Sequence, residues 1–211
     1  MDNDQAIKLV ERGYNKIYRD YNRNRQMKND RTLIEKFAKS FTENAKVLDV
    51  GCGSGKVAAL LSGYGLQIVG IDISKNMLGL AKKNSPRSKF YLMDMKDMNF
   101  QSESFDGVIS LYAIIHTPRR YHHLILSKMY KFLKPGGRLL ISVGRTDSKE
   151  WFEKNWHGSR MYWSHFDRKK NEDLIKNTGF RIKYSREIGP PGDRHVFVFA
   201  TKPASKKPLN T

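Results

Sequence analysis

The sequence is almost without cysteine: among its 211 residues only Cys52 carries a thiol. An intramolecular disulfide is therefore excluded, and a reducing compartment is the natural setting. No run of about 18 apolar residues occurs, so no segment is expected to span a membrane. The polar start, residues 1–5, does not resemble a secretory leader. These absences together predict a cytoplasmic protein without membrane partners.

Acidic side chains are scarce beside basic ones, since 21 Asp and Glu accompany 39 Lys and Arg and give a formal net charge of +18. Such an excess could attract nucleic acid, an anionic membrane or an acidic substrate. The excess is spread along the whole chain, and its densest cluster also fits the solvent side of a helix: Arg19, Arg23, Arg25, Lys28 and Arg31. RNA therefore remains an alternative partner, although the sequence shows no basic arm or tail dedicated to binding it.

The hydrophobic pattern changes near residue 45. Before it, apolar residues recur every three or four positions and predict two amphipathic helices, at 4–22 and 30–41. After it, short apolar runs alternate with helical stretches, as in βαβ units. The predicted strands are 46–50, 67–72, 89–93, 105–111, 138–143, 180–187 and 195–201. The predicted helices between them are 56–62, 74–84, 121–133 and 168–178.

The last two strands are joined by a short turn and must pair antiparallel, because a parallel pair needs a long crossover. We therefore predict an α/β fold with a doubly wound, Rossmann-like sheet of seven strands. The sheet is mostly parallel, with one antiparallel strand from the C-terminal hairpin, helices on both faces and an N-terminal helical cap. The stretch 145–167 is predicted to be irregular, and residues 203–211 to form a flexible tail.

A glycine-rich loop follows the first predicted strand. Gly51, Gly53 and Gly55 alternate there, which lets a ligand approach bare backbone near a helix start. Asp72 closes the next strand, where a carboxylate can accept two hydrogen bonds from a ribose diol. Either a nicotinamide dinucleotide or S-adenosylmethionine would suit these features. The dinucleotide fingerprint requires glycine where this chain has Lys56, so the spacing favours S-adenosylmethionine.

Five motifs, in order, resemble the class I S-adenosylmethionine-dependent methyltransferases, specifically the type 11 branch that is similar to ubiquinone/menaquinone C-methyltransferases. They are VLDVGCGSG (47–55), GIDIS (70–74), DM with MNF (94–100), SFDGVI (104–109) and LKPGGRL (133–139). The resemblance is strong over about residues 45–144 and weak on the flanks. It implies a methyltransferase domain over 45–202, with the helices of residues 1–44 capping the cofactor site.

The resemblance also implies which residues hold the methionyl part of the cofactor. Asp49 and the backbone of Gly51 and Gly53 would bind it, within the loop that also contains Ser54. Leu111, at the end of the fourth predicted strand, would lie beside the sulfonium.

The adenosine part is assigned in the same way. Asp72 would bind the ribose hydroxyls, and Ile73 would pack on adenine, whose pocket Met77 could line. Asp94 would accept from the exocyclic amine, and the Met95 backbone would meet a ring nitrogen. Carboxylates suit a ligand with hydroxyls, an ammonium and a sulfonium, and suit a pyrophosphate badly.

Methyl transfer from a sulfonium is an in-line displacement that chiefly requires positioning and exclusion of water. A general base is needed only if the acceptor arrives protonated. His116, soon after the fourth predicted strand, is the candidate base, with a positioning or structural role left open. This chain has Ile115 where a His-His pair is common in the family.

Acceptor contacts are predicted in two segments. In the first helix Tyr14 and Tyr18, together with Tyr21, could fold over the cofactor, although an aromatic stripe there also fits a core. Residues 145–167 are a candidate substrate lid or a packed cover, with a dense set of aromatic and polar side chains: Trp156, Tyr162, Trp163 and His165. His157, His165 and Asp167 match no strong metal-ligand spacing, so no metal is predicted.

The sequence thus predicts a methyltransferase that modifies oxygen, nitrogen or carbon of a small molecule. An RNA or tRNA methyltransferase and a binding module without catalysis remain alternatives. Cys52 lies inside the glycine loop, which argues against the RNA enzymes that use a cysteine nucleophile on pyrimidine C5. Ser110-Leu111-Tyr112-Ala113 replaces the Pro-Pro-aromatic motif of amino-methyltransferases of DNA, which lowers that class too.

Overall fold

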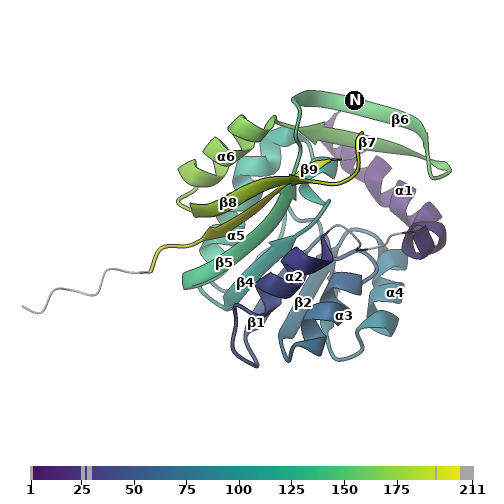
Figure 1. Ribbon diagram of the computed structural model, residues 1–211. Helices are drawn as coiled ribbons and strands as arrows, with labels where there is room; N and C mark the ends of the chain where they lie inside the picture. Colours follow the sequence, from purple (N-terminus) through teal and green to yellow (C-terminus); the bar gives the residue numbers. More distant parts are fainter. Residues whose placement is uncertain (1, 25–26, 28–29, 193, 205–211) are drawn as a thin grey trace, which may run out of the picture.

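The computed structural model describes residues 2–24, 27, 30–192 and 194–204 (Figure 1). In this part of the chain seven strands form one sheet in the order β3-β2-β1-β4-β5-β9-β8. The strands are β1 (Lys46–Val50), β2 (Gln67–Asp72), β3 (Lys89–Leu92), β4 (Phe105–Ser110), β5 (Leu133–Val143), β8 (Arg181–Ile188) and β9 (His195–Thr201). The first five are parallel, and β9 runs antiparallel to both of its neighbours. The predicted fold class is confirmed.

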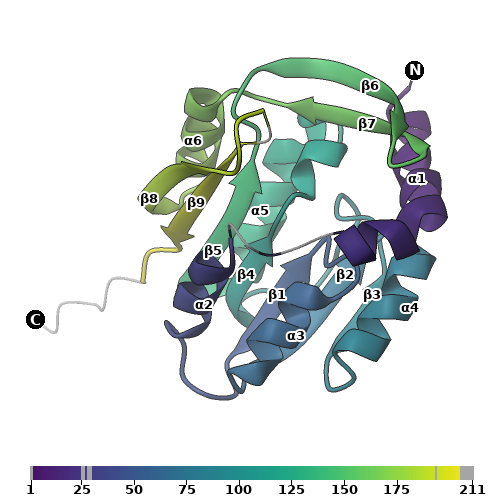
Figure 2. The same cartoon turned by 45° about the vertical axis from the view of Figure 1, so that its right-hand side comes forward.

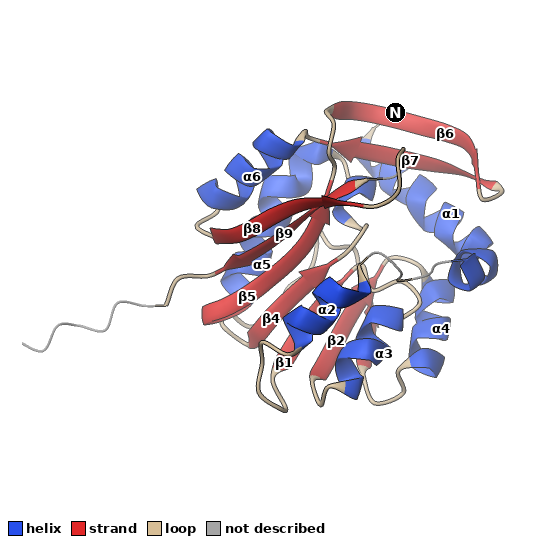
Figure 3. Cartoon of the chain, in the orientation of Figure 1, coloured by secondary structure: helices blue, strands red, loops and turns tan. Residues whose placement is uncertain are grey.

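Helices cover both faces of the sheet (Figure 3). They are α1 (Asn3–Asn24), α2 (Arg31–Ala38), α3 (Lys56–Gly63), α4 (Lys75–Asn84), α5 (His122–Phe132) and α6 (Arg168–Asn177), with short 3-10 turns η1 (Ile114–His116) and η2 (Arg119–Tyr121). Successive strand residues point to opposite faces. Val47 therefore joins a core with α2 and α3, and Leu48 joins a second core with α5. None of the described helices has the length and apolar character that crossing a bilayer requires.

The helix α1 lies at the carboxyl edge of the parallel strands, between α4 and the strand β7 (Figure 2). Asn15 fastens it to the start of α4: its side-chain oxygen accepts from Ser74 Oγ at 2.8 Å and from the Asn76 backbone at 3.1 Å. Gly13 lets α1 approach β7 closely, because a Cβ there would lie 2.8 Å from Met161 Cε and 3.2 Å from the Arg160 carbonyl oxygen. In contrast to α1, α2 packs on the sheet face beside α3.

The stretch 145–167 is not irregular as predicted. It forms a two-stranded antiparallel hairpin of β6 (Ser148–Trp156) and β7 (Ser159–His165) above the edge of the main sheet (Figure 2). His157 and Gly158 make the turn with φ of 48° and 88°. A two-residue turn with positive φ at both positions matches the twist of a hairpin, and Asn-Gly is its usual sequence. The hairpin was missed because His-Gly is an uncommon form of that signal.

The remaining differences concern boundaries. The strand β5 begins at Leu133, five residues before the predicted start at 138, and includes the Pro-Gly-Gly segment. Its register against β4 shifts between Phe105 and Gly107. Of the predicted flexible tail, residues 205–211 lie outside the described residues.

Candidate functional site

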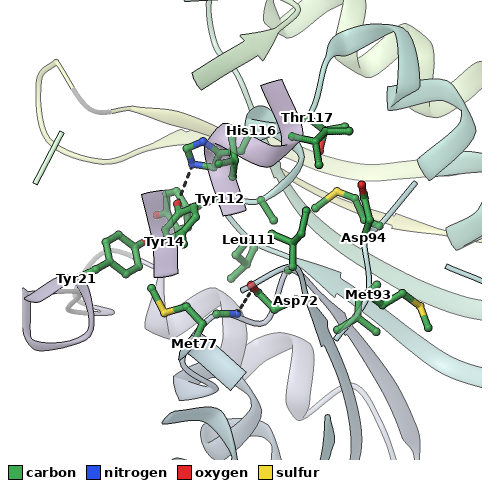
Figure 4. A pocket seen from close by; sticks show the side chains of 18 residues that line it. Tyr14, Tyr21, Asp72, Met77, Met93, Asp94, Leu111, Tyr112, His116 and Thr117 are labelled. Atoms are coloured by element: carbon green, nitrogen blue, oxygen red, sulfur yellow. Dashed lines mark hydrogen bonds between the residues drawn. The ribbon is translucent and has the colours of Figure 1, made fainter. Parts of the chain in front are cut away.

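A cavity of about 680 Å³, counting its open mouth, lies beneath α1 at the carboxyl ends of β1, β2 and β4 (Figure 4). Most of the residues predicted to bind a cofactor line it: Gly51, Gly53, Asp72, Ile73, Met77, Asp94, Met95 and Leu111. Asp49 and Ser54 are buried and do not line it. The folded chain thus gathers residues from the ends of four strands, β1 to β4, around one space, and we call it the first cavity.

The glycine loop has its shape for two different reasons. Gly51 has φ of 75°, and a Cβ there would lie 2.3 Å from the Ala113 Cβ. Gly53 has φ of 52°, and a Cβ there would meet nothing within 4 Å. The first glycine therefore permits close packing against the segment after β4. The second leaves the wall of the cavity as bare backbone.

Asp72 is oriented by backbone donors on both sides. Its Oδ2 accepts from the Gly53 N–H at 2.8 Å (Figure 4). Its Oδ1 accepts from the Ser74 N–H at 2.8 Å. Burial raises the pKa of this carboxyl, although the hydrogen bonds act in the opposite direction. Each carboxylate oxygen keeps a further lone pair, so this fixed group can still accept hydrogen bonds from a ligand.

Asp49 is buried, with 2% of its surface exposed, and its Oδ2 has no hydrogen-bond partner among the described residues. Burial, and next the charge of Asp72, raises its pKa from 3.8 to about 8. A buried carboxyl with an unmet acceptor is costly unless a cation or a donor approaches it. A positively charged ligand group that donates a hydrogen bond to Asp49 would therefore be favoured at this site.

Asp94 is the second carboxyl that lines the cavity. Its Oδ1 accepts from the Lys96 N–H at 2.9 Å, and Lys96 Nζ lies 3.7 Å from its Oδ2. Burial raises its pKa, and Lys96 lowers it. Met77, Met93 and Met95 supply apolar wall around these carboxyls.

His116 lies where α1 meets η1. Its Nδ1 is 2.9 Å from the Tyr162 carbonyl oxygen, which can only accept, so Nδ1 carries the proton. Burial lowers the His116 pKa to about 4, so the ring is neutral near pH 7 and its Nε2 is an acceptor. Tyr14 Oη, 2.9 Å away, therefore donates to Nε2 (Figure 4).

A second cavity, of about 1980 Å³ counting its open mouth, extends from this pair under the hairpin. Four residues border both cavities: Tyr14, Tyr21, Tyr112 and His116. The predicted acceptor residues Trp156, Trp163 and His165 line the second one. Nowhere in the described ranges do three His, Cys, Asp or Glu side chains gather as metal ligands would.

Two predicted acceptor residues line neither cavity. Tyr162 is next to Trp163 in β7, so it points to the opposite side of the hairpin, where its ring packs 5.2 Å from Phe152. Its contribution is the carbonyl that holds His116. Tyr18 is half-buried and accepts a 2.7 Å hydrogen bond from Arg19 Nε. Tyr21, two helical turns after Tyr14, lines the cavities in its place.

Tyr112 is the residue at this boundary that sequence reasoning missed. It has φ of 58°, which is unfavourable for a residue with a Cβ, and its N–H donates to Ser142 Oγ at 2.6 Å. Strained backbone of this kind concentrates at functional sites. Its position directly after Leu111 was the available signal, but no pattern in the sequence indicates a positive φ at a tyrosine.

Comparison with known proteins finds a methyltransferase family and individual methyltransferases that are similar to this chain. Residues 48–141 match a family described as a methyltransferase domain. The chain is 30% identical to sterol 24-C-methyltransferase of Candida albicans over 73% of its length, and 32% identical to phosphoethanolamine N-methyltransferase 2 of Caenorhabditis elegans over 70%. It spans only 44% and 35% of those two proteins.

A solved structure shares the fold over nearly the whole chain. It is the 1,6-didemethyltoxoflavin-N1-methyltransferase of Burkholderia thailandensis, with bound 1,6-didemethyltoxoflavin and S-adenosylhomocysteine. It matches with a TM-score of 0.76 at 19% identity, over 96% of this chain and 91% of that one.

Proposed function

Because this chain belongs to the class I S-adenosylmethionine-dependent methyltransferases of the type 11 family, we propose that it transfers a methyl group from S-adenosylmethionine to oxygen, nitrogen or carbon of a small molecule. One observation supports the proposal above the others. Two carboxyls, Asp72 and Asp94, line the first cavity, and a third, Asp49, is buried near Asp72. No Lys or Arg is among the described residues that line the cavity. This charge pattern suits an ammonium, a ribose diol and an amine, and it would repel the pyrophosphate of a dinucleotide.

The residues present fit this cofactor. Asp49 offers an unmet buried acceptor to the methionyl ammonium, beside the backbone of Gly51, Gly53 and Ser54. Asp72, fixed by two backbone donors, would accept from the ribose hydroxyls.

At the other end of the first cavity, Ile73 and Met77 would contact adenine, whose polar edge would meet Asp94 and the Met95 backbone. When bound, S-adenosylmethionine supplies a methyl carbon on a sulfonium, open to displacement by a nucleophile. Leu111 and Tyr112 would border the methyl group of the cofactor, next to the second cavity.

The second cavity would receive the acceptor, with Tyr14, Tyr112 and His116 between the two ligands. His116 is a poor proton acceptor, because its burial depresses its pKa to about 4 and Tyr14 already occupies Nε2. We therefore assign His116 the role of positioning the Tyr14 hydroxyl at the boundary, in place of the base suggested by the sequence. Acceptors that arrive with an available lone pair suit such a site.

The test is calorimetric titration of S-adenosylmethionine and S-adenosylhomocysteine into the wild type and Asp72→Ala. Loss of hydrogen bonds to a charged group should weaken binding by about 1.5–3 kcal/mol. Asp97→Ala is the matched control, since that carboxyl is exposed and pairs with Lys96 outside the cavity. No binding to the wild type would refute the proposal.

Transfer itself is tested by supplying labelled S-adenosylmethionine with a metabolite extract and, separately, with total RNA. Label in small molecules supports the proposed acceptor class. Label in RNA, with binding that weakens steeply as salt rises, would favour the RNA alternative. Cofactor binding without any labelled product would favour the module without catalysis.

A further inference from the structure

Three tryptophans of the hairpin line one wall of the second cavity. Trp151 and Trp163 pair across the hairpin with ring centroids 4.8 Å apart, and Trp156 packs 5.5 Å from Trp163. Trp151 nevertheless keeps 51% of its surface exposed. A half-exposed indole beside two others, all lining one cavity, offers a surface on which a flat, unsaturated molecule can stack.

Two arginines line the same cavity from other segments. Arg145 follows β5, and Arg194 directly precedes β9. Neither guanidinium has a hydrogen-bond or ion-pair partner in the part of the chain that the structure describes. Both are exposed, so both can turn toward a ligand at the mouth. Guanidinium groups bind carboxylate and phosphate through paired hydrogen bonds.

Among the described residues three acids line this cavity, and they differ in pairing and burial. Asp147 is 3.0 Å from Arg119 Nη1 and 3.4 Å from Lys170 Nζ. Asp30 is fully buried. Glu153, on the hairpin between Trp151 and Trp156, is the acid at the cavity for which the described residues show no ion pair. Unpaired charge around the cavity therefore favours an anion, in a protein whose net charge of +18 also attracts one.

We infer that the acceptor is a flat aromatic or heteroaromatic molecule that carries a carboxylate or phosphate. Its ring lies on the indoles of Trp151, Trp156 and Trp163, and its anionic group lies at Arg145 and Arg194. The inference rests on the proposed function, because the nucleophilic atom must reach Tyr14 and Tyr112 at the boundary with the first cavity. His116 is a weak base, which suits a nucleophile that reacts without a strong base, such as a ring nitrogen or an acidic phenol.

The experiment uses three probes with one ring and three charges: indole-3-acetate, indole-3-acetamide and tryptamine. Each is titrated into the full chain saturated with S-adenosylhomocysteine, in a calorimeter at low salt. The anion should bind about tenfold more tightly than the amide, because charge-assisted hydrogen bonds are stronger than neutral ones. Tryptamine should bind most weakly.

Two variants separate the charge from the ring. In Arg145→Ala/Arg194→Ala the acetate should lose its advantage and bind like the amide, whereas Arg87→Ala, an exposed arginine outside both cavities, should bind like the wild type. In Trp151→Leu both the acetate and the amide should bind about fivefold more weakly, by the loss of aromatic stacking. Unchanged S-adenosylhomocysteine affinity and thermal unfolding in each variant would show that the fold is intact.

The outcomes distinguish this inference from the proposed function. If S-adenosylhomocysteine binds normally but the three probes bind equally, or the double arginine variant keeps the preference for the acetate, this inference is wrong and the proposed function stands. Tightest binding of tryptamine, abolished by Glu153→Gln, would identify a cationic acceptor instead. Failure of the wild type to bind S-adenosylhomocysteine would overturn the proposed function and this inference together.

Discussion

The two cavities that meet at Tyr14 and His116 are built in different ways. The first is walled by strand ends and by the glycine loop, and its central carboxylate, Asp72, is held by two backbone N–H groups. The second is walled by side chains from α1, the hairpin, the loop after β5 and the turn before β9. The first therefore has a geometry fixed by the sheet, whereas the second can change with each lining side chain while the sheet stays the same. Such a division lets one scaffold serve many acceptors.

The largest effect should come from crowding the backbone wall of the first cavity. Gly51→Ala places a Cβ 2.3 Å from that of Ala113, at a φ of 75°. Overpacking and backbone strain together should lower the free energy of unfolding by about 3 kcal/mol, as measured by urea titration. Gly53→Ala, whose Cβ would meet no atom within 4 Å, should cost only about 1 kcal/mol. Equal losses in the two variants would contradict this account of the loop.

This contrast also explains what could be predicted from the sequence. The parallel sheet, the glycine loop and the positions of Asp72 and Asp94 follow from βα units, because neighbouring parallel strands bring their carboxyl ends together. The acceptor wall depends on how α1 and a hairpin dock from distant parts of the chain. Aromatic density pointed to Trp156 and Trp163, but nothing local indicated that Tyr21 would replace Tyr18 or that Tyr162 would point away.

A pH-dependent effect should distinguish Asp49 from the rest of the first cavity. A carboxyl whose pKa rises from 3.8 to about 8 on folding stabilises the fold only while it is protonated, so its contribution is lost as the pH rises from 4 to 8. Asp49→Asn cannot ionise. The stability of the variant relative to the wild type, from urea unfolding without ligand, should therefore increase between pH 5 and pH 8.

The same variant should bind S-adenosylmethionine more weakly by about 1.5–3 kcal/mol at pH 8, because the ammonium loses its charged partner. A stability difference that stays constant between pH 5 and pH 8 would show that Asp49 is already ionised in the free protein. Asp97→Asn, at an exposed carboxyl, is the control for the general effect of removing a negative charge.

A smaller effect is expected at the boundary of the two cavities. Tyr14→Phe removes the donor to His116 Nε2 and leaves that buried nitrogen without this partner, so the free energy of unfolding should fall by about 1 kcal/mol. Affinity for S-adenosylhomocysteine should stay within about twofold, since the lost bond faces the ring of His116. Tyr18 lines neither cavity, so Tyr18→Phe should change neither quantity. Matching losses in both variants would argue against a special role for the Tyr14–His116 pair.

The smallest effect should appear at the tip of the hairpin. His157 has φ of 48°, which Asn tolerates better than other residues with a side chain. His157→Asn should therefore raise the free energy of unfolding by a few tenths of a kcal/mol, and His157→Ala should lower it by about as much. A higher thermal midpoint for the alanine variant than for the asparagine variant would contradict the turn assignment.

The docking of α1 has a consequence for turnover. One rigid helix, fastened to α4 through Asn15, contributes Tyr14 and Tyr21 to both cavities. A displacement of α1 large enough to uncover the first cavity must also remove two walls of the second. In the proposed reaction, such a displacement would widen the exits of S-adenosylhomocysteine and of the methylated product together. The hydrogen bonds of Asn15 would oppose that displacement, so breaking them would influence the rates at which both molecules leave.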